Sequence, residues 1–179
     1  MGVPTVHPPE DCYAIQLVRG RGLISHGIAW WGFGWNGDSH ADAVLPDGSL
    51  LGARDDRIKI KDGRVIPPGV QVRPAGYKRW ERRTLYWKPT TKERAQAWRD
   101  ALLAVADRGT AYDREGILRL ILGEQPIDDG KYFCSCLMIA KLQECNEVGK
   151  LPVAPQQVSP TALGMLLGGL DWSWKELPV

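Results

Sequence analysis

Residues 132–142 place a cysteine where a loop is expected to become an amphipathic helix. Turn-forming residues fill positions 126–130, whereas apolar residues recur at helical spacing after Cys134. The unpaired N–H groups and aligned peptide dipoles at a helix N-terminus stabilise a thiolate. They can bring a cysteine pKa from about 8.5 down to roughly 3.5–7.5 when a basic partner is present. Cys134 is therefore a candidate nucleophile, and the alternative is a buried cysteine that serves as a small hydrophobe.

A thiolate nucleophile needs a base, and histidine is the side chain that titrates near neutrality. His7 lies in a proline-rich segment, residues 1–11, which is expected to be an irregular arm, and His26 lies in an apolar run that is expected to be buried. His40 leads into a tight hairpin and has Asp42 two residues on, hence on the same face of a strand. We therefore favour His40 as the base. Asp42 is either its orienting carboxylate or a solvated strand residue.

Strands are expected in the first half of the chain, where short apolar runs alternate with turn residues. The predicted strands are residues 12–18, 39–45, 49–54, 57–60, 65–66, 70–73 and 84–87, the last of these completing the sheet. The turn Asp47-Gly48 is a strong hairpin signal between the second and third. A further apolar run at 23–31 leads into a glycine-rich loop at 32–37, which is either an aromatic wall of a cleft or a loop packed on the core.

From Thr90 the hydrophobic period changes from two to 3.6 residues. Thr90 and Glu93 match a capping box, and Gly109 is placed to end the helix. The predicted helices are residues 91–107, 113–122, 133–148 and about 160–167, the last starting at Ser159-Pro160 and followed by a tail that should pack on the body. Strands followed by helices indicate an α+β domain with an antiparallel sheet. We expect a single domain spanning residues 1–179 in which the histidine strand precedes the cysteine helix.

Composition agrees with a soluble globular chain, because 44% of the residues are hydrophobic and 25% are charged. The net charge of +2 is too small to indicate a nucleic-acid partner, and the basic run of Lys78, Arg79, Arg82 and Arg83 is interpreted as a solvated face. No apolar run approaches the roughly 20 residues of a transmembrane helix, and the first residues lack the pattern of a signal peptide. We therefore expect a cytoplasmic location.

The four cysteines do not form a spaced disulfide framework, which favours a reducing compartment. Cys134, Cys136 and Cys145 raise the alternative of a zinc site, but their spacing is not that of paired zinc knuckles. At about 100° per residue, Cys136 points some 200° away from Cys134 on a helix. The same geometry argues against a redox disulfide between them. No metal or other cofactor is expected.

Five short motifs occur in a characteristic order. They are Ser-His-Ala-Asp-Ala-Val-Leu-Pro-Asp-Gly at 39–48, Leu-Gly-Ala-Arg at 51–54, Pro-Gly-Val at 68–70, Tyr-Asp at 112–113 and Phe-Cys-Ser at 133–135. In order and spacing the chain resembles the circularly permuted NlpC-type papain-fold family over roughly residues 24–165. That family includes YiiX-like proteins and phage-encoded relatives and is similar in plan to lecithin retinol acyltransferase. The resemblance implies a permuted papain-like fold, with an antiparallel sheet packed on helices.

The resemblance also implies a cysteine nucleophile matching Cys134 and a general base matching His40. It implies a third polar residue on the next strand, and this position falls at Gly52, which has no side chain. Asp42 and Arg54 are the polar residues nearby, and a carboxylate is chemically better suited to accept the imidazole N–H. Cys136 stands where the family often carries glutamate.

The activity that the resemblance implies is hydrolysis of an amide or isopeptide bond in a cell-wall peptide of peptidoglycan, through a thioester intermediate. Acyl-ester or thioester hydrolysis and acyl transfer are alternatives within the same chemistry. An alternative of another class is a non-catalytic binding protein or a phage structural protein that retains the fold.

Overall fold

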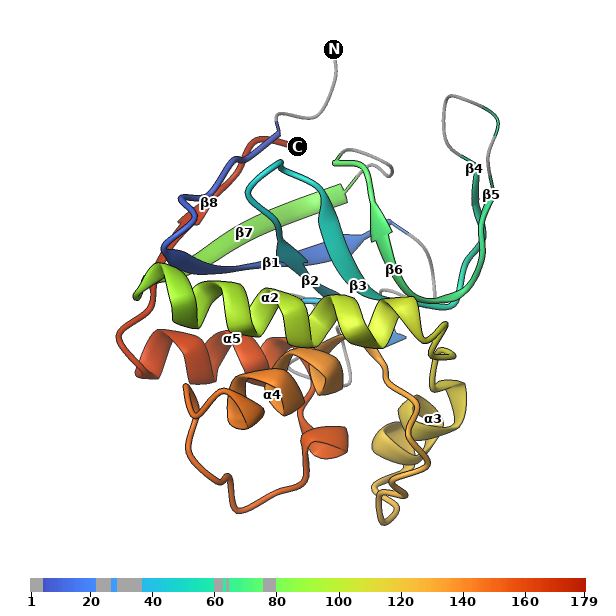
Figure 1. The fold of residues 1–179 in the computed structure, drawn as a ribbon. Coiled ribbons are helices and arrows are strands. Elements are labelled where there is room, and N and C mark those ends of the chain that lie inside the picture. Colours follow the sequence, from blue (N-terminus) through green and yellow to red (C-terminus); the bar gives the residue numbers. More distant parts are fainter. Residues whose placement is uncertain (1–4, 22–26, 29–36, 60–62, 64, 76–79) are drawn as a thin grey trace.

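The computed structural model describes residues 5–21, 27–28, 37–59, 63, 65–75 and 80–179 (Figure 1). Its named strands are β1 (Cys12–Gly20), β2 (His40–Val44), β3 (Leu50–Arg54), β4 (Ile58–Lys59), β5 (Val65–Ile66), β6 (Gly69–Arg73), β7 (Trp80–Pro89) and β8 (Ser173–Glu176). Its named helices are α2 (Lys92–Asp107), α3 (Arg114–Leu122), α4 (Cys134–Glu144), the short 3-10 helix η2 (Pro155–Gln157) and α5 (Pro160–Gly169). The predicted α+β class with an antiparallel sheet is confirmed.

Six strands form one antiparallel sheet in the order β6-β3-β2-β1-β7-β8. The predicted hairpin is present, with Ala43 opposite Leu51 and the turn closed by a hydrogen bond from the Leu45 N–H to the Ser49 carbonyl. Gly48 in this turn has φ of 81°, a conformation that glycine adopts without strain. The expectation that residues 84–87 complete the sheet is wrong, because the C-terminal tail adds β8 alongside β7.

The two faces of the sheet are covered differently. Helices α2, α4 and α5 lie on one side of it (Figure 1) and bury the alternate residues Ile15, Leu17, Ala41, Ala43 and Leu51. On the other face, Ala14, Val44 and Leu85 form a smaller cluster with Val6 from the N-terminal arm and Leu177 from the tail. The catalytic candidates of β2, His40 and Asp42, alternate with Ala41 and Ala43, so they do not belong to the helix-covered core.

The helices begin close to the predicted positions, with two differences. Thr91, not Thr90, caps α2, and its hydroxyl accepts a hydrogen bond from the Arg94 N–H. Helix α4 ends at Glu144, short of the predicted residue 148, because Asn146 adopts a positive φ of 56° that terminates the helical path. Asp113 caps α3 and Ser159 caps α5, each through its side-chain oxygen.

The interpretation of the basic run as a solvated face is wrong for Arg83. This side chain is buried and donates to Gln16 Oε1 and to the Pro178 carbonyl, while Arg82 pairs with Asp38. Lys78 and Arg79 lie outside the described residues. So do His26, most of the predicted apolar run at 23–31 and most of the glycine-rich loop at 32–37.

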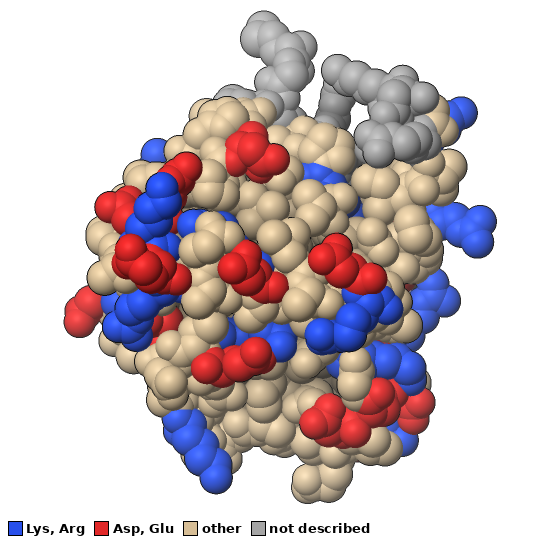
Figure 2. All heavy atoms as spheres, viewed as in Figure 1, with Lys and Arg blue, Asp and Glu red and all other residues tan. Residues whose placement is uncertain are grey.

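On the face shown in Figure 2, acidic and basic side chains are interspersed. No helix in the described ranges is long and apolar enough to cross a bilayer.

Candidate active site

Cys134 is the first residue of α4 and follows an extended residue, Phe133, with φ of −103° and ψ of 173°. No side chain caps this helix, so the N–H groups of its first turn lack the usual intramolecular acceptor. Two interactions hold the helix start in place. The Ser135 hydroxyl donates to the Val158 carbonyl over 2.6 Å, and Tyr132 forms a parallel bridge with Tyr112. The N-terminus of α4 is thus fixed against neighbouring segments, and among the described residues no side chain takes up the N–H groups of its first turn.

His40 is the first residue of β2 and lies opposite Val18 of β1. Its Nε2 atom is 2.8 Å from Asp42 Oδ1, and both side chains are buried. A carboxylate can only accept, so the proton of the imidazole lies on Nε2 and donates to Asp42. The lone pair of the neutral ring therefore lies on Nδ1. His40 and Asp42 lie on one face of the strand, as alternation predicted, and they are in direct contact.

The Cys134 thiol lies close enough to His40 and to the backbone N–H of Ala41 for both to lower its pKa. Because Nε2 of His40 donates to Asp42, Nδ1 is the ring nitrogen that is left to interact with the sulfur. The structure therefore brings the thiol, the imidazole and the carboxylate together at one site. These groups are contributed by the N-terminus of α4 and by one strand, β2.

The charges around Cys134 and His40 favour a thiolate beside an imidazolium. Burial acts to raise the pKa of Cys134, but the charge and hydrogen bond of His40 outweigh it, so the pKa lies below its ordinary value. Burial acts to lower the pKa of His40, yet the Asp42 carboxylate raises it above its ordinary value. Burial likewise acts to raise the pKa of Asp42, but His40 holds it low. Asp42 is fully buried, which contradicts the alternative of a solvated strand carboxylate.

The structure explains why position 52 is glycine. A Cβ atom on Gly52 would overlap Oδ1 of Asp42, well inside the 3.0 Å below which such contacts essentially never occur, and would lie 3.1 Å from the Ala41 carbonyl oxygen. The carboxylate of β2 thus fills the space where a side chain of β3 would begin. Position 52 lacks a polar side chain because the Asp42 carboxylate occupies the space that such a side chain would need.

Two further residues lie beside the site: Trp80, which the sequence did not assign to it, and Arg54, which the sequence offered as a polar residue near position 52. Trp80, at the start of β7, stacks on the His40 ring, and the Arg54 guanidinium lies over the same indole. Arg54 itself forms a paired contact with Asp56 through Nε and Nη2. Nothing in the sequence pattern singled out Trp80, because its place near His40 depends on β7 pairing with β1 across a bulge at Arg19.

The other cysteines are chemically distinct from Cys134. Burial raises the pKa of Cys136 to about 12, and burial also raises the pKa of Cys145 above its ordinary value. All four cysteines are free thiols. Within the described ranges, no three side chains of His, Cys, Asp or Glu gather in a way that could hold a metal ion.

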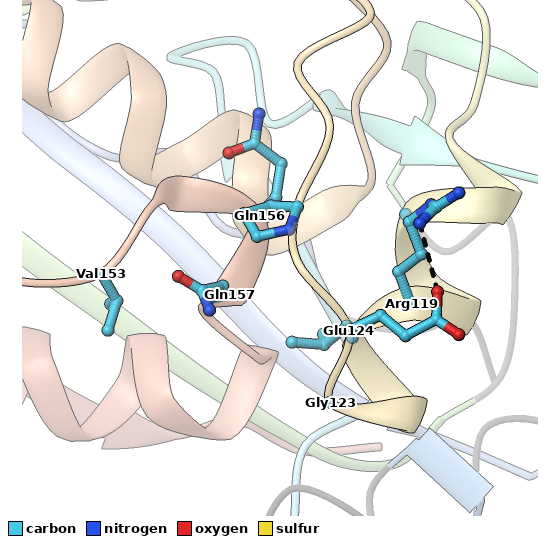
Figure 3. Close-up of a pocket in the computed structure, with 9 residues that line it drawn as sticks. Arg119, Gly123, Glu124, Val153, Gln156 and Gln157 are labelled. Carbon is cyan, nitrogen blue, oxygen red and sulfur yellow. Dashed lines mark hydrogen bonds and ion pairs between the residues drawn. The ribbon is translucent and has the colours of Figure 1, made fainter.

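A separate pocket of about 240 Å³ lies between α3 and η2 (Figure 3). Arg119 and Glu124, which form an ion pair, flank it on one side, and Gln156 and Gln157 contribute from η2. None of the residues Cys134, His40 and Asp42 lines this pocket. It is therefore not the place where the thiol would meet a substrate.

The geometry of Cys134, His40 and Asp42 is suited to nucleophilic attack by sulfur with proton transfer through the imidazole. No protein-family model matches the chain, and no curated protein sequence matches it significantly.

Proposed function

We propose that this chain is a cysteine-dependent hydrolase with a circularly permuted papain-like fold. The observation that carries the proposal is the grouping of Cys134 with the hydrogen-bonded pair His40 and Asp42, in which the pKa of the thiol is lowered and that of the imidazole is raised. A cysteine kept only for packing would show the opposite direction, as Cys136 does. Perturbed pKa values of this kind cluster at functional sites.

The fold proposal is supported by the order of the site elements. The histidine strand β2 precedes the cysteine helix α4, and the sheet beside that helix is antiparallel throughout. This is the arrangement that the resemblance to the permuted NlpC-type family implies. Gly52, the one departure from that pattern that suggested a decayed site, is accounted for by the Asp42 carboxylate that occupies its place.

In the proposed mechanism, the Cys134 thiolate attacks the carbonyl carbon of the substrate. The resulting oxyanion accepts a hydrogen bond from the Cys134 backbone N–H, at the uncapped start of α4. The imidazolium of His40 then gives its Nδ1 proton to the leaving group, and a thioester is left on sulfur. His40, neutral again, takes a proton from water as that water attacks the thioester, and the acid product and the free thiol are released. Asp42 holds the ring and stabilises its charged form.

We propose an amide or isopeptide bond of a peptidoglycan peptide as the substrate, on the strength of the resemblance. Acyl esters and thioesters are the second candidates, since the same acyl-enzyme chemistry cleaves them. The decisive experiment incubates the protein with peptidoglycan fragments, and in parallel with a panel of acyl esters, and identifies products by mass spectrometry. Cys134→Ser serves as the control.

Products that require Cys134 support the proposal and define the substrate class. A Cys134 that alkylates slowly at pH 6–7, together with no effect of His40→Ala on that rate, would refute the mechanism. A reactive Cys134 without cleavage of either substrate class would favour the other reading, a binding or phage structural protein that retains the fold.

A further inference from the structure

Trp80 contacts the catalytic base from the face of its ring. The centroids of the Trp80 and His40 rings are 6.3 Å apart with an interplanar angle of 16°, an offset stack. Only 3% of Trp80 is exposed, and it is the first residue of β7, opposite Gly20 at the bulged end of the ladder. It approaches His40 from a strand that supplies none of Cys134, His40 and Asp42.

The ring of His40 can turn about χ2, a torsion with a broad, shallow preference in histidine. Such a rotation moves Nε2 away from Asp42 and Nδ1 away from Cys134, so the polar contacts of the ring restrain it only while they are formed. A flat surface packed against the ring restricts this rotation. It also excludes water, which would otherwise compete for the Nε2 proton that Asp42 accepts.

The Trp80 indole also contacts the positively charged side chain of Arg54. The Arg54 guanidinium carbon is 5.4 Å from the centroid of the Trp80 ring, within the range of a cation–π contact, while Asp56 binds its Nε and Nη2 atoms. Arg54 is charged and close enough to His40 to disfavour a second positive charge there. Trp80 and Asp56 therefore fix the position of a cation whose charge acts on the base.

We propose that Trp80 is a positioning residue that acts through His40, holding the imidazole plane so that Nδ1 and Nε2 face Cys134 and Asp42 at the same time. This inference rests on the proposed function. The charged groups that face His40 are Asp42 on its own strand, Arg54 on β3 and Cys134 on α4. Trp80 carries no charge, so it affects the titration of the site only through geometry and the exclusion of water.

The test is the rate of alkylation of Cys134 by iodoacetamide between pH 5 and 9, which requires no knowledge of the substrate. In Trp80→Leu the ring of His40 is released, so its bonds to Cys134 and Asp42 weaken together. The pKa of the thiol should rise and that of the imidazole should fall. Alkylation near pH 6 should drop by about tenfold for each unit that the thiol pKa rises. Trp80→Phe keeps an aromatic face and should recover most of the rate at pH 6.

Trp172→Leu is the matched control for loss of a buried tryptophan. Trp172 is also 3% exposed and stacked, but on Tyr13, with centroids 6.1 Å apart, and it lies in the core beside the helices. Both leucine variants should lower the thermal midpoint, whereas only Trp80→Leu should shift the pH profile of Cys134. A shift of equal size in both variants would overturn the proposal, since it would show a general loss of packing.

His40→Ala separates this inference from the proposed function. If His40→Ala leaves the reactivity of Cys134 unchanged, the dyad itself is refuted. If His40→Ala slows alkylation at pH 6 and folded Trp80→Leu does not, the dyad stands and Trp80 has no positioning role. If Trp80→Leu proves too unstable to purify, folded Trp80→Met takes its place in the same comparison, because it keeps a large apolar side chain and removes the aromatic face.

Discussion

Gly52 and Asp42 face each other across β3 and β2, and the Asp42 carboxylate fills the volume that any side chain at position 52 would need. Gly52→Ala should therefore displace the carboxylate from His40 and lower turnover by at least about tenfold, since the orienting member of such a site fixes the tautomer and direction of the ring. Steady-state kinetics on a substrate found in the cleavage assay proposed above measures the change.

A double-mutant cycle separates displacement from strain. In an Asp42→Ala background the obstructing oxygen is gone, so Gly52→Ala should cost little further activity, and the two substitutions should be strongly non-additive. Gly168→Ala is the control, because a Cβ there meets no atom within 4 Å and lies in α5. Additive losses in the cycle would show that Gly52 acts independently of Asp42.

Asp42→Asn tests the charge of the orienting group while keeping its shape. Turnover should fall by at least about tenfold, because the amide stabilises the imidazolium less and does not enforce the Nε2 tautomer. The lowered pKa of Asp42 also has a stability consequence. Since the group is held ionised by the fold, the wild-type protein should exceed Asp42→Asn in thermal midpoint above the ordinary carboxyl pKa of 3.8.

That advantage should shrink as the pH falls below 3.8 toward the folded-state pKa. A difference in thermal midpoint that is constant from pH 3 to 7 would contradict the assignment. Unchanged turnover in Asp42→Asn would mean that the carboxylate does not orient His40.

The pH dependence of kcat/KM should be bell-shaped. Its acid limb reports formation of the Cys134 thiolate, whose pKa is lowered from the ordinary 9.0, and its alkaline limb reports loss of the His40 proton, whose pKa is raised from 6.5. Activity therefore rises at a pH below 9 and persists beyond 6.5 before it falls. A single rise near pH 9 with no alkaline limb would exclude the thiolate–imidazolium pair.

Two cysteines of one tryptic peptide should differ sharply in labelling. Lys131 and Lys141 bracket both Cys134 and Cys136, so fragment ions of a single peptide report both sites. The pKa of Cys134 is lowered while burial raises that of Cys136 to about 12. At pH 7 iodoacetamide should therefore modify Cys134 and leave Cys136 unmodified. Equal labelling of the native protein would argue that the peptide is unfolded or that Cys134 is not activated.

Arg54→Gln should extend the alkaline limb. The guanidinium lowers the pKa of the neighbouring His40, so its removal should let the imidazolium persist to higher pH. Arg57→Gln is a suitable comparison on the exposed segment that follows β3. An alkaline limb that moves to lower pH would contradict the assigned sign.

The sequence predicted the class of fold and the strand–turn–strand unit that carries His40, because alternation, Asp-Gly turns and helix caps are local signals. It also placed Asp42 on the face of His40, which follows from the period of a strand. The addition of β8 could not be predicted, since the pairing of Ser173–Glu176 with β7 depends on where a distant segment returns.

The same limit applies within the site. Trp80 reaches His40 through strand pairing and a bulge, and Gly52 gains its meaning only when Asp42 is seen lying over it. From the sequence alone Gly52 suggested a missing group. The register between strands decides which residues of different strands become neighbours. This register depends on the complete fold, so local sequence patterns do not predict it.

The N-cap position of α4 is Phe133, which has no capping side-chain oxygen, although a serine or aspartate there typically adds about 0.5–2 kcal/mol to the stability of a helix. A capping oxygen would accept from the N–H of the second or third helical residue and would place negative charge beside the Cys134 N–H that the proposed reaction directs at the oxyanion. Thermal robustness and turnover thus make opposite demands on the side chain at position 133. Selection for heat resistance alone would be expected to favour a polar residue at position 133 and to yield a sturdier, slower protein.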